Sequence, residues 1–303
     1  MYQKKNQSSP RFAAMLSALG YRCVNVQGIY WYEYNSFLRP ACLPHCCPPI
    51  SVTDASQAIE ITGLPFARWE TDWEAREPTH WWCINRYPPY DMASLSGNTR
   101  SKIRRGQKRY HGRLVTPSEI STHCFAVCEK AVSRFGDLSF LPLREELNSL
   151  ADAAAQFPDC LEVFGVFCDE KLIGFSGNYV DGNAVLIDKL WYDPEHLSSY
   201  SSYVLVDAML SFYLNDRKVE YLSDGSRNLH HQTNVHDFLV QKFGFVRVGA
   251  TLNLCYARWF GAAVRVVFPF RAGVSSLASK SGSGTIKKID GILRQEEIAR
   301  RQG

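Results

Sequence analysis

The stretch LSDGSRNLHHQTNVHDFLVQKFG, residues 222–244, indicates a strand, a polar turn and a helix in close succession. The apolar residues at 219–222 fit a short strand, and Asp224 opens a turn at 224–226. Residues 233–234 can cap a helix that ends at Gly244, because its apolar side chains recur at helical spacing. Turns at the carboxyl ends of strands commonly bind ligands in open α/β sheets, so we expect functional residues here.

The chain around this stretch has a regular pattern of apolar residues and turn signals. Apolar spacing and turn tripeptides separate its helices from its strands. The predicted elements are helices at 117–135 and 143–156, three antiparallel strands within 162–194, a helix at 201–214 and a closing strand or hairpin at 246–259. This order predicts a mixed α/β fold.

The overall composition is that of a folded protein. The chain has 303 residues, 46% of them hydrophobic, and its formal net charge of +4 does not require a nucleic-acid partner. Ten cysteines occur, but the start of the chain is polar and no apolar run reaches transmembrane length. We therefore expect reduced thiols, no transmembrane segment and a cytoplasmic location.

Four parts are predicted along the chain: a flexible N-terminal segment at 1–20, an N-terminal α/β lobe at 21–113, a main domain at 114–257 and a C-terminal extension with a mobile basic tail at 258–303. The first part holds a short helix that stops at Gly20. The last part contains a Ser-Gly-rich linker and a charged final helix, a composition typical of mobile segments.

The strongest charge cluster lies in LSGNTRSKIRRGQKRYHGR, residues 95–113, where Ser96 or Asn98 can cap a helix. Three interpretations remain open for this basic segment: a solvated helix face, a clamp for phosphate or carboxylate groups, and a surface that binds tRNA. Arg104 is the substrate-binding candidate chosen from it.

The order of predicted elements over residues 114–257 resembles the GNAT acetyltransferase superfamily. The basic segment ahead of this domain, together with DGSRNLHHQTNVHDFLVQKFGF near its end, resembles Fem-type and related bacterial acyltransferases, which carry a partial or full second GNAT-like lobe. The resemblance implies an α/β (α+β) fold: a mixed, mainly antiparallel sheet flanked by helices, with a smaller N-terminal GNAT-like lobe.

The resemblance also implies a reaction. The donor would be acyl-CoA, acetyl-CoA or a similar thioester, and the acceptor an amine on a small molecule or peptide. The alternative is a Fem-type transfer of an amino acid from charged tRNA to a peptide or peptidoglycan precursor. A third possibility is a non-catalytic binding module that kept the fold.

In GNAT proteins the pyrophosphate of the donor binds at the loop and helix start after the fourth strand. The matching positions here, with Asn234 added from the next helix, give these cofactor-binding candidates: His196, Ser198, Ser199, Ser201, Ser202 and Asn234. Serines replace the usual paired glycines, which limits close approach to a phosphate. The tyrosine that protonates the leaving thiolate in many GNAT enzymes is replaced by Val240.

Candidate catalytic residues follow from titration chemistry. Asp224 can accept a proton from an amine or cap its turn. A histidine from the segment holding His230, His231 and His236 can act as base, and His230 is the one chosen.

On the strand that precedes the donor loop, IDKLWYDP at residues 187–194, Asp188 is a catalytic candidate and Lys189 a substrate-binding one. Strand alternation predicts that only one of these two points inward.

Several further residue groups can be either structural or functional. Arg227 can bind an anionic group of the substrate or be a solvated surface residue. Trp31 can line an acceptor pocket with Tyr32, Trp81 and Trp82, although aromatics in strands are more often core residues. Cys124 and Cys128 are expected to face the core.

Two segments raise the question of a metal or a membrane. Cys42, His45, Cys46 and Cys47 lack a second ligand pair at zinc spacing, so no metal is expected. The apolar run at 259–270 is too short to span a membrane. It can associate weakly with a membrane surface, complete the core or pack between lobes.

Overall fold

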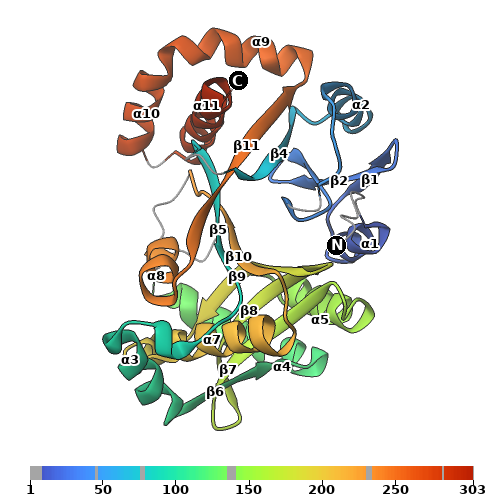
Figure 1. Cartoon of the computed structure of the whole chain (residues 1–303). Coiled ribbons are helices and arrows are strands. Elements are labelled where there is room, and N and C mark those ends of the chain that lie inside the picture. The colour runs from blue at the N-terminus through green and yellow to red at the C-terminus, as the bar shows by residue number, and fades with distance from the viewer. Residues whose placement is uncertain are drawn as a thin grey trace.

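The computed structural model describes residues 9–44, 47–75, 79–134, 141–229, 234–281 and 283–302. In these residues one large sheet is flanked by helices (Figure 1), which confirms the expected fold class. The strands are β1 (Cys23–Val26), β2 (Ile29–Tyr34), β3 (Phe37–Pro40), β4 (Phe66–Ala75), β5 (Trp81–Arg86), β6 (Tyr110–Leu114), β7 (Leu161–Cys168), β8 (Lys171–Asp181), β9 (Ala184–Tyr192), β10 (Tyr221–Ser226) and β11 (Val246–Tyr256).

The helices are α1 (Pro10–Ala18), α2 (Val52–Thr62), α3 (Gly97–Gln107), α4 (Pro117–Ser133), α5 (Arg144–Gln156), α6 (Pro194–Leu197), α7 (Ser201–Leu210), α8 (Asn234–Phe243), α9 (Arg258–Val267), α10 (Arg271–Lys280) and α11 (Gly284–Gln302). A π-helical turn, η4 (Ser211–Asp216), extends α7, and short 3-10 helices, η2 (Met92–Ser94) and η5 (Phe268–Phe270), precede α3 and α10. In the described part of the chain, no helix is both long and apolar enough to cross a bilayer.

Local sequence signals explain where several helices begin. Thr116 and Glu119 form a capping box before α4, and Pro117 occupies its first position. Ser96 caps α3 by accepting a hydrogen bond from the Thr99 N–H. These helices match the predicted ones within two residues at their starts.

The strands are ordered β1-β2-β3-β4-β11-β5-β10-β9-β8-β7-β6. Strands β7, β8 and β9 pair antiparallel, as predicted. Strand β10 pairs parallel to β9 on one side and antiparallel to β5 on the other. Strand β5, which comes from the N-terminal part of the chain, therefore lies between two strands from the C-terminal part.

Helices cover both faces of the sheet around β7 and β8. Alternation along β7 sends Phe164 into the core shared with α7, while Val163 joins the core shared with α4 and α5. Cys124 and Cys128 on α4 are buried in the second of these cores, as predicted. The strand β9 thus separates a side covered by α7 from a side covered by α4 and α5.

Two expectations differ from the structure, and the short helix expected near the start of the chain is present. Trp31 is completely buried and packs edge-to-face on Trp69, so it is a core residue and not part of a substrate pocket. Residues 10–18 form α1, which agrees with the short helix expected before Gly20 and buries Phe12 and Leu16. The final helix α11 is docked because Leu293 and Ile298 are buried and Gln302 accepts a hydrogen bond from the Leu252 N–H of β11.

Candidate functional site

Strands β9 and β10 pair over a short length and then separate. Their parallel register covers Tyr221 to Ser223 of β10 and Ala184 to Leu186 of β9. Beyond Ser223, the pairing of β10 with β5 is irregular until Ser226, and Gly225 has a positive φ of 82°. Asp224 lies in this irregular segment, at the point where the two strands part.

Asp224 and His236 form a buried pair at this point. His236 Nε2 lies 3.3 Å from Asp224 Oδ2, and the side chains of His236 and Asp224 are 14% and 11% exposed. Burial raises the pKa of the Asp224 carboxyl to about 8 and lowers the pKa of His236. Near neutral pH these two shifts leave one proton on the pair, on the Asp224 carboxyl, next to a neutral imidazole that can exchange it.

Aromatic residues surround this pair. The ring of Trp82, on β5, lies 5.6 Å from that of His236, and Arg247 stacks 4.7 Å from Trp82. Tyr192, at the end of β9, has a pKa raised first by burial and then by the charge of Asp224. The surroundings of the pair therefore come from β5 in the N-terminal part of the chain and from β9 and β11 in the C-terminal part.

The loop between β9 and α7 is covered by the basic helix α3. Arg109 Nη1 donates a hydrogen bond of 3.4 Å to Ser199 Oγ, and the Arg105 guanidinium lies 4.7 Å from the centre of the Tyr200 ring. On the same loop, His196 Nδ1 is 3.1 Å from the Tyr110 hydroxyl. The predicted donor loop and the predicted basic helix are thus parts of one surface.

The first turn of α7 has the features of an anion site. Tyr200 precedes it with a left-handed φ of 73°, and among the described residues the N–H groups of Ser201 and Ser202 find no acceptor. Ser201 is completely buried, and its hydroxyl has no partner in the described chain. Free N–H groups at a helix start attract phosphate and carboxylate groups.

The positive charge of α3 is largely uncompensated. The basic segment contains one residue, Arg113, that forms an ion pair, at 2.7 Å from Glu119. None of its six other cations forms an ion pair within the described chain: Arg100, Lys102, Arg104, Arg105, Lys108 and Arg109. Cations next to a helix start give this surface a strong preference for anions.

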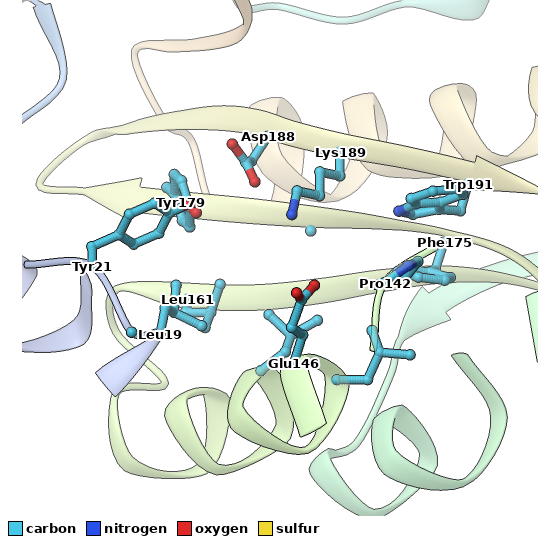
Figure 2. Close-up of a pocket in the computed structure, with 14 residues that line it drawn as sticks. Leu19, Tyr21, Pro142, Glu146, Leu161, Phe175, Tyr179, Asp188, Lys189 and Trp191 are labelled. Carbon is cyan, nitrogen blue, oxygen red and sulfur yellow. The ribbon is translucent and has the colours of Figure 1, made fainter. Parts of the chain in front are cut away.

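A pocket of about 360 Å³ lies on the α5 side of the sheet. It is lined by α5, β7, β8, β9 and the turn after α1, and it contains both Asp188 and Lys189 (Figure 2). The expectation that only one of these two would point inward is wrong. Lys189 pairs with Gly177 and Ile187 with Asn178, which leaves Asp188 as the extra residue of a β-bulge.

Opposite charges face each other across this pocket. Figure 2 shows Lys189 and Glu146 projecting from opposite walls, with Asp188 beside the lysine. Lys189 has no ion-pair partner within 4.0 Å in the described chain, and burial raises the pKa of Asp188 while Lys189 opposes that rise. Tyr21 and Tyr179 line one end and Trp191 the other. The pocket can therefore hold a small molecule that carries both charges.

Other predicted residues lie apart from these surfaces or outside the described chain. Arg104 is exposed on α3, whereas the contacts to the donor loop come from Arg105 on α3 and from Arg109 just after its end. Arg227 is held by the His80 carbonyl at 2.8 Å and lines a separate pocket with α10 and α11. Ser198 is exposed at the end of α6.

Some predictions fall on residues that the structure does not describe. His230 and His231 lie outside the described ranges, as does the side chain of Asn234, whose backbone begins α8. His236, which shares the histidine-rich segment, is the histidine beside Asp224. The sequence does not single out Glu146, Arg105 and Arg109 individually, because only their proximity to distant segments reveals them.

A metal site gains no support from the described side chains. Asp193, Glu195 and His196 lie close enough to share an ion, but Lys130 already pairs with the two carboxylates at 2.7 Å and 2.9 Å. His45 and Cys46 of the cysteine cluster lie outside the described residues.

No protein-family model and no curated protein sequence matches the chain. Its structure is similar to the C-terminal domain of a protein described as a lysylphosphatidylglycerol synthetase from Agrobacterium fabrum, with TM-score 0.56 and 11% identity over 86% of this chain and 91% of that chain. FemX matches with TM-score 0.56 and 8% identity over 80% of this chain and 89% of its own. L-PGS from Bacillus licheniformis matches with TM-score 0.50 and 13% identity over 99% and 100%. These similarities show that the chain shares its fold with FemX and the lysylphosphatidylglycerol synthetase domain.

Proposed function

We propose, for a chain with this GNAT-like and Fem-like fold, that the protein transfers an acyl group from a phosphate-bearing donor to an amine. The observation that carries this proposal is the packing of the basic helix α3 on the loop before α7. The N–H group of Ser202, which is partly exposed, and the guanidinium groups of Arg105 and Arg109 can then bind the same phosphate. An anionic donor fits this surface far better than a neutral one.

Asp224 and His236 supply the proton transfer in this scheme. An amine attacks a carbonyl only as the neutral base, so a nearby group must accept its proton. The C–N bond forms as the C–S or C–O bond of the donor breaks, and the pair returns the proton to the leaving sulfur or oxygen. With this proton route, the reaction does not need a tyrosine at position 240, where the chain has Val240.

The pocket around Lys189 is the acceptor site in this proposal. Glu146 and Asp188 attract an ammonium group, while Lys189 attracts a carboxylate. The aromatic residues at its ends give apolar contact. An amine that also carries a carboxylate, such as an amino acid or a short peptide, matches these groups in charge.

Two donors satisfy the requirement for phosphate. An acyl-CoA thioester is our first choice, because the start of α7 and two arginines suffice for a pyrophosphate. An aminoacyl-tRNA is the second candidate, and the six unpaired cations of the basic segment favour it. A nucleic acid, with phosphates at regular spacing, would use more of these cations than a pyrophosphate would.

A binding experiment separates the two donors. Calorimetric titration of the full chain with acetyl-CoA and a long-chain acyl-CoA is compared with filter binding of charged tRNA at low and moderate salt. Micromolar acyl-CoA binding supports the first donor. Tight tRNA binding that falls about a thousandfold from 50 to 200 mM salt, as expected for roughly six phosphate contacts, supports the second.

Variants tie the result to the site. Arg105→Glu/Arg109→Glu should abolish binding of whichever donor is found, whereas Arg134→Glu, at an exposed position at the end of α4, should not. Failure to bind either donor, or binding that survives the double substitution, would overturn the proposal and favour a non-catalytic module.

A further inference from the structure

Helices α9 and α10, joined by η5, form a helical segment from Arg258 to Lys280 on the outside of the molecule. Figure 1 shows α9 running along one end of the molecule and α10 continuing from it beside α11. Only Val264 and Ala278 of this segment are buried. Part of the apolar run at 259–270 packs on the sheet, as one of the roles expected from the sequence requires, because Phe260 stacks on Phe66 of β4 and Val264 is buried. The rest of the run is partly or fully exposed.

The apolar side chains of this segment form an exposed stripe, which we define as Trp259, Val266, Phe270 and Leu277. They are 64%, 70%, 68% and 59% exposed. Trp259 and Val266, seven residues apart, share one side of α9, while Phe270 ends η5 and Leu277 lies on α10. Proteins rarely leave several large apolar side chains together in water, so a partner surface is expected to cover the stripe.

The charges in the sequence that carries the stripe are all positive. Between residues 258 and 289 the sequence has six basic and no acidic residues. Arg258, Arg265 and Lys280 are exposed, and within the described chain they form no ion pair. Arg271 is turned inward and pairs with Glu297 on α11 at 3.5 Å. The partner surface must therefore be apolar where it contacts the stripe and negatively charged where it meets the flanking arginines and lysines.

We propose that the stripe docks on an anionic lipid bilayer. A helix that lies in the interface buries its apolar side chains among the acyl chains, while flanking arginines and lysines contact lipid phosphates. Trp259 suits this depth because indole rings favour the boundary between headgroups and hydrocarbon. A second copy of the chain is a poorer fit, since it would bring Arg258 and Arg265 close to like charges.

This surface is independent of the acyl-transfer proposal. None of the stripe residues is among those that line the Lys189 pocket, and Figure 1 shows α9 and α10 at the end of the molecule away from α3 and α7. Membrane docking would hold the whole chain at a bilayer whatever donor it uses.

Vesicle co-sedimentation of the full chain tests the proposal. Vesicles of phosphatidylcholine with phosphatidylglycerol should bind the protein, and vesicles of phosphatidylcholine alone should bind it much less. Trp259→Ser/Phe270→Ser should weaken binding about tenfold or more, because two large apolar side chains no longer enter the bilayer. Arg258→Gln/Arg265→Gln should reduce the preference for the anionic vesicles.

Matched controls distinguish the stripe from exposed apolar surface elsewhere. Val52→Ser/Ile61→Ser removes apolar side chains of similar exposure, 64% and 60%, from α2 and should leave vesicle binding unchanged. Thermal unfolding of each variant establishes that it folds. Undiminished binding by Trp259→Ser/Phe270→Ser would overturn the proposal. A protein that ignores vesicles but changes from dimer to monomer on this substitution would also overturn it, in favour of a second copy.

Discussion

Gly106 on α3 approaches Tyr200 so closely that a Cβ atom on the glycine would lie 3.0 Å from the Tyr200 carbonyl oxygen. The same atom would lie 2.6 Å from Cγ2 of Val204, one turn into α7. Gln107, the next residue, donates a 3.0 Å hydrogen bond to Asp207 on α7. The absence of a side chain at position 106 is what lets the cationic helix rest on the loop that begins α7.

Gly106→Ala should separate these two helices. We expect a loss of about 1–3 kcal/mol in the free energy of unfolding, because the added methyl group meets backbone as well as a flexible side chain. Urea unfolding measures this loss, and titration with the donor should show weaker binding. Gly97→Ala is the matched control on the same helix, since its Cβ would meet nothing closer than Arg100 at 3.9 Å. Equal effects of the two substitutions would contradict this account.

Asp224→Asn should lower the transfer rate about 100- to 10,000-fold, the range expected when a general base is lost. Donor binding should stay within a few-fold, because Asp224 does not belong to the α3 surface. In the unmodified protein kcat/KM should rise with pH until about pH 8, where the pair loses its shared proton. Asp237→Asn, an exposed neighbour of His236, is the control and should keep full activity.

Asp224 should also make stability depend on pH. Its pKa rises from an ordinary value of about 3.9 to about 8 on folding, so between these values the folded state binds more protons than the unfolded state. The stabilising effect is complete below about pH 4 and is lost as the pH rises to about 8, at no more than about 1.4 kcal/mol per pH unit.

The stabilities of the unmodified protein and Asp224→Asn are best compared between about pH 7 and pH 8. His236, with its lowered pKa, has no further proton to lose in this interval. Urea unfolding across this interval should show the unmodified protein losing stability relative to Asp224→Asn. Parallel curves for the two proteins would mean that the carboxyl is ionised when folded.

Gly177→Leu should block the pocket that faces Lys189. A Cβ atom at Gly177 meets nothing within 4 Å, so a larger side chain can enter the cavity without moving its walls. We expect the KM for the acceptor to rise at least tenfold while donor affinity is unchanged, as measured by steady-state kinetics and direct titration. Gly177→Ala should have a much smaller effect. If the leucine left acceptor kinetics intact, the acceptor site would lie elsewhere.

Local elements are predictable from the chain, since helix α4 and the β7 to β9 meander follow from apolar spacing and turn residues. Helix α2 does not emerge in the same way, although Ser51 and Asp54 form a capping box and Gly63 ends the helix with a positive φ of 72°. Its apolar spacing is too weak to separate it from a strand.

Contacts between distant segments are harder to predict. Arg109 and Ser199 lie 90 residues apart, and the sequence of neither segment indicates that the two are in contact. The bulge at Asp188 reverses strand alternation without a glycine or proline to mark it. Trp31 is predicted to line a pocket although it lies in the core. The sequence of a strand does not show whether its aromatic residue faces a ligand or the core.

The position of β5 between β10 and β11 has a consequence for how the chain is made. During synthesis β5 emerges long before either neighbour, and until both arrive its two edges have no partner from the completed sheet. Pairings between segments so far apart close slowly, and exposed strand edges invite association with other chains. Folding is thus completed only after β11 has left the ribosome, and a polypeptide that stops earlier would be prone to aggregate.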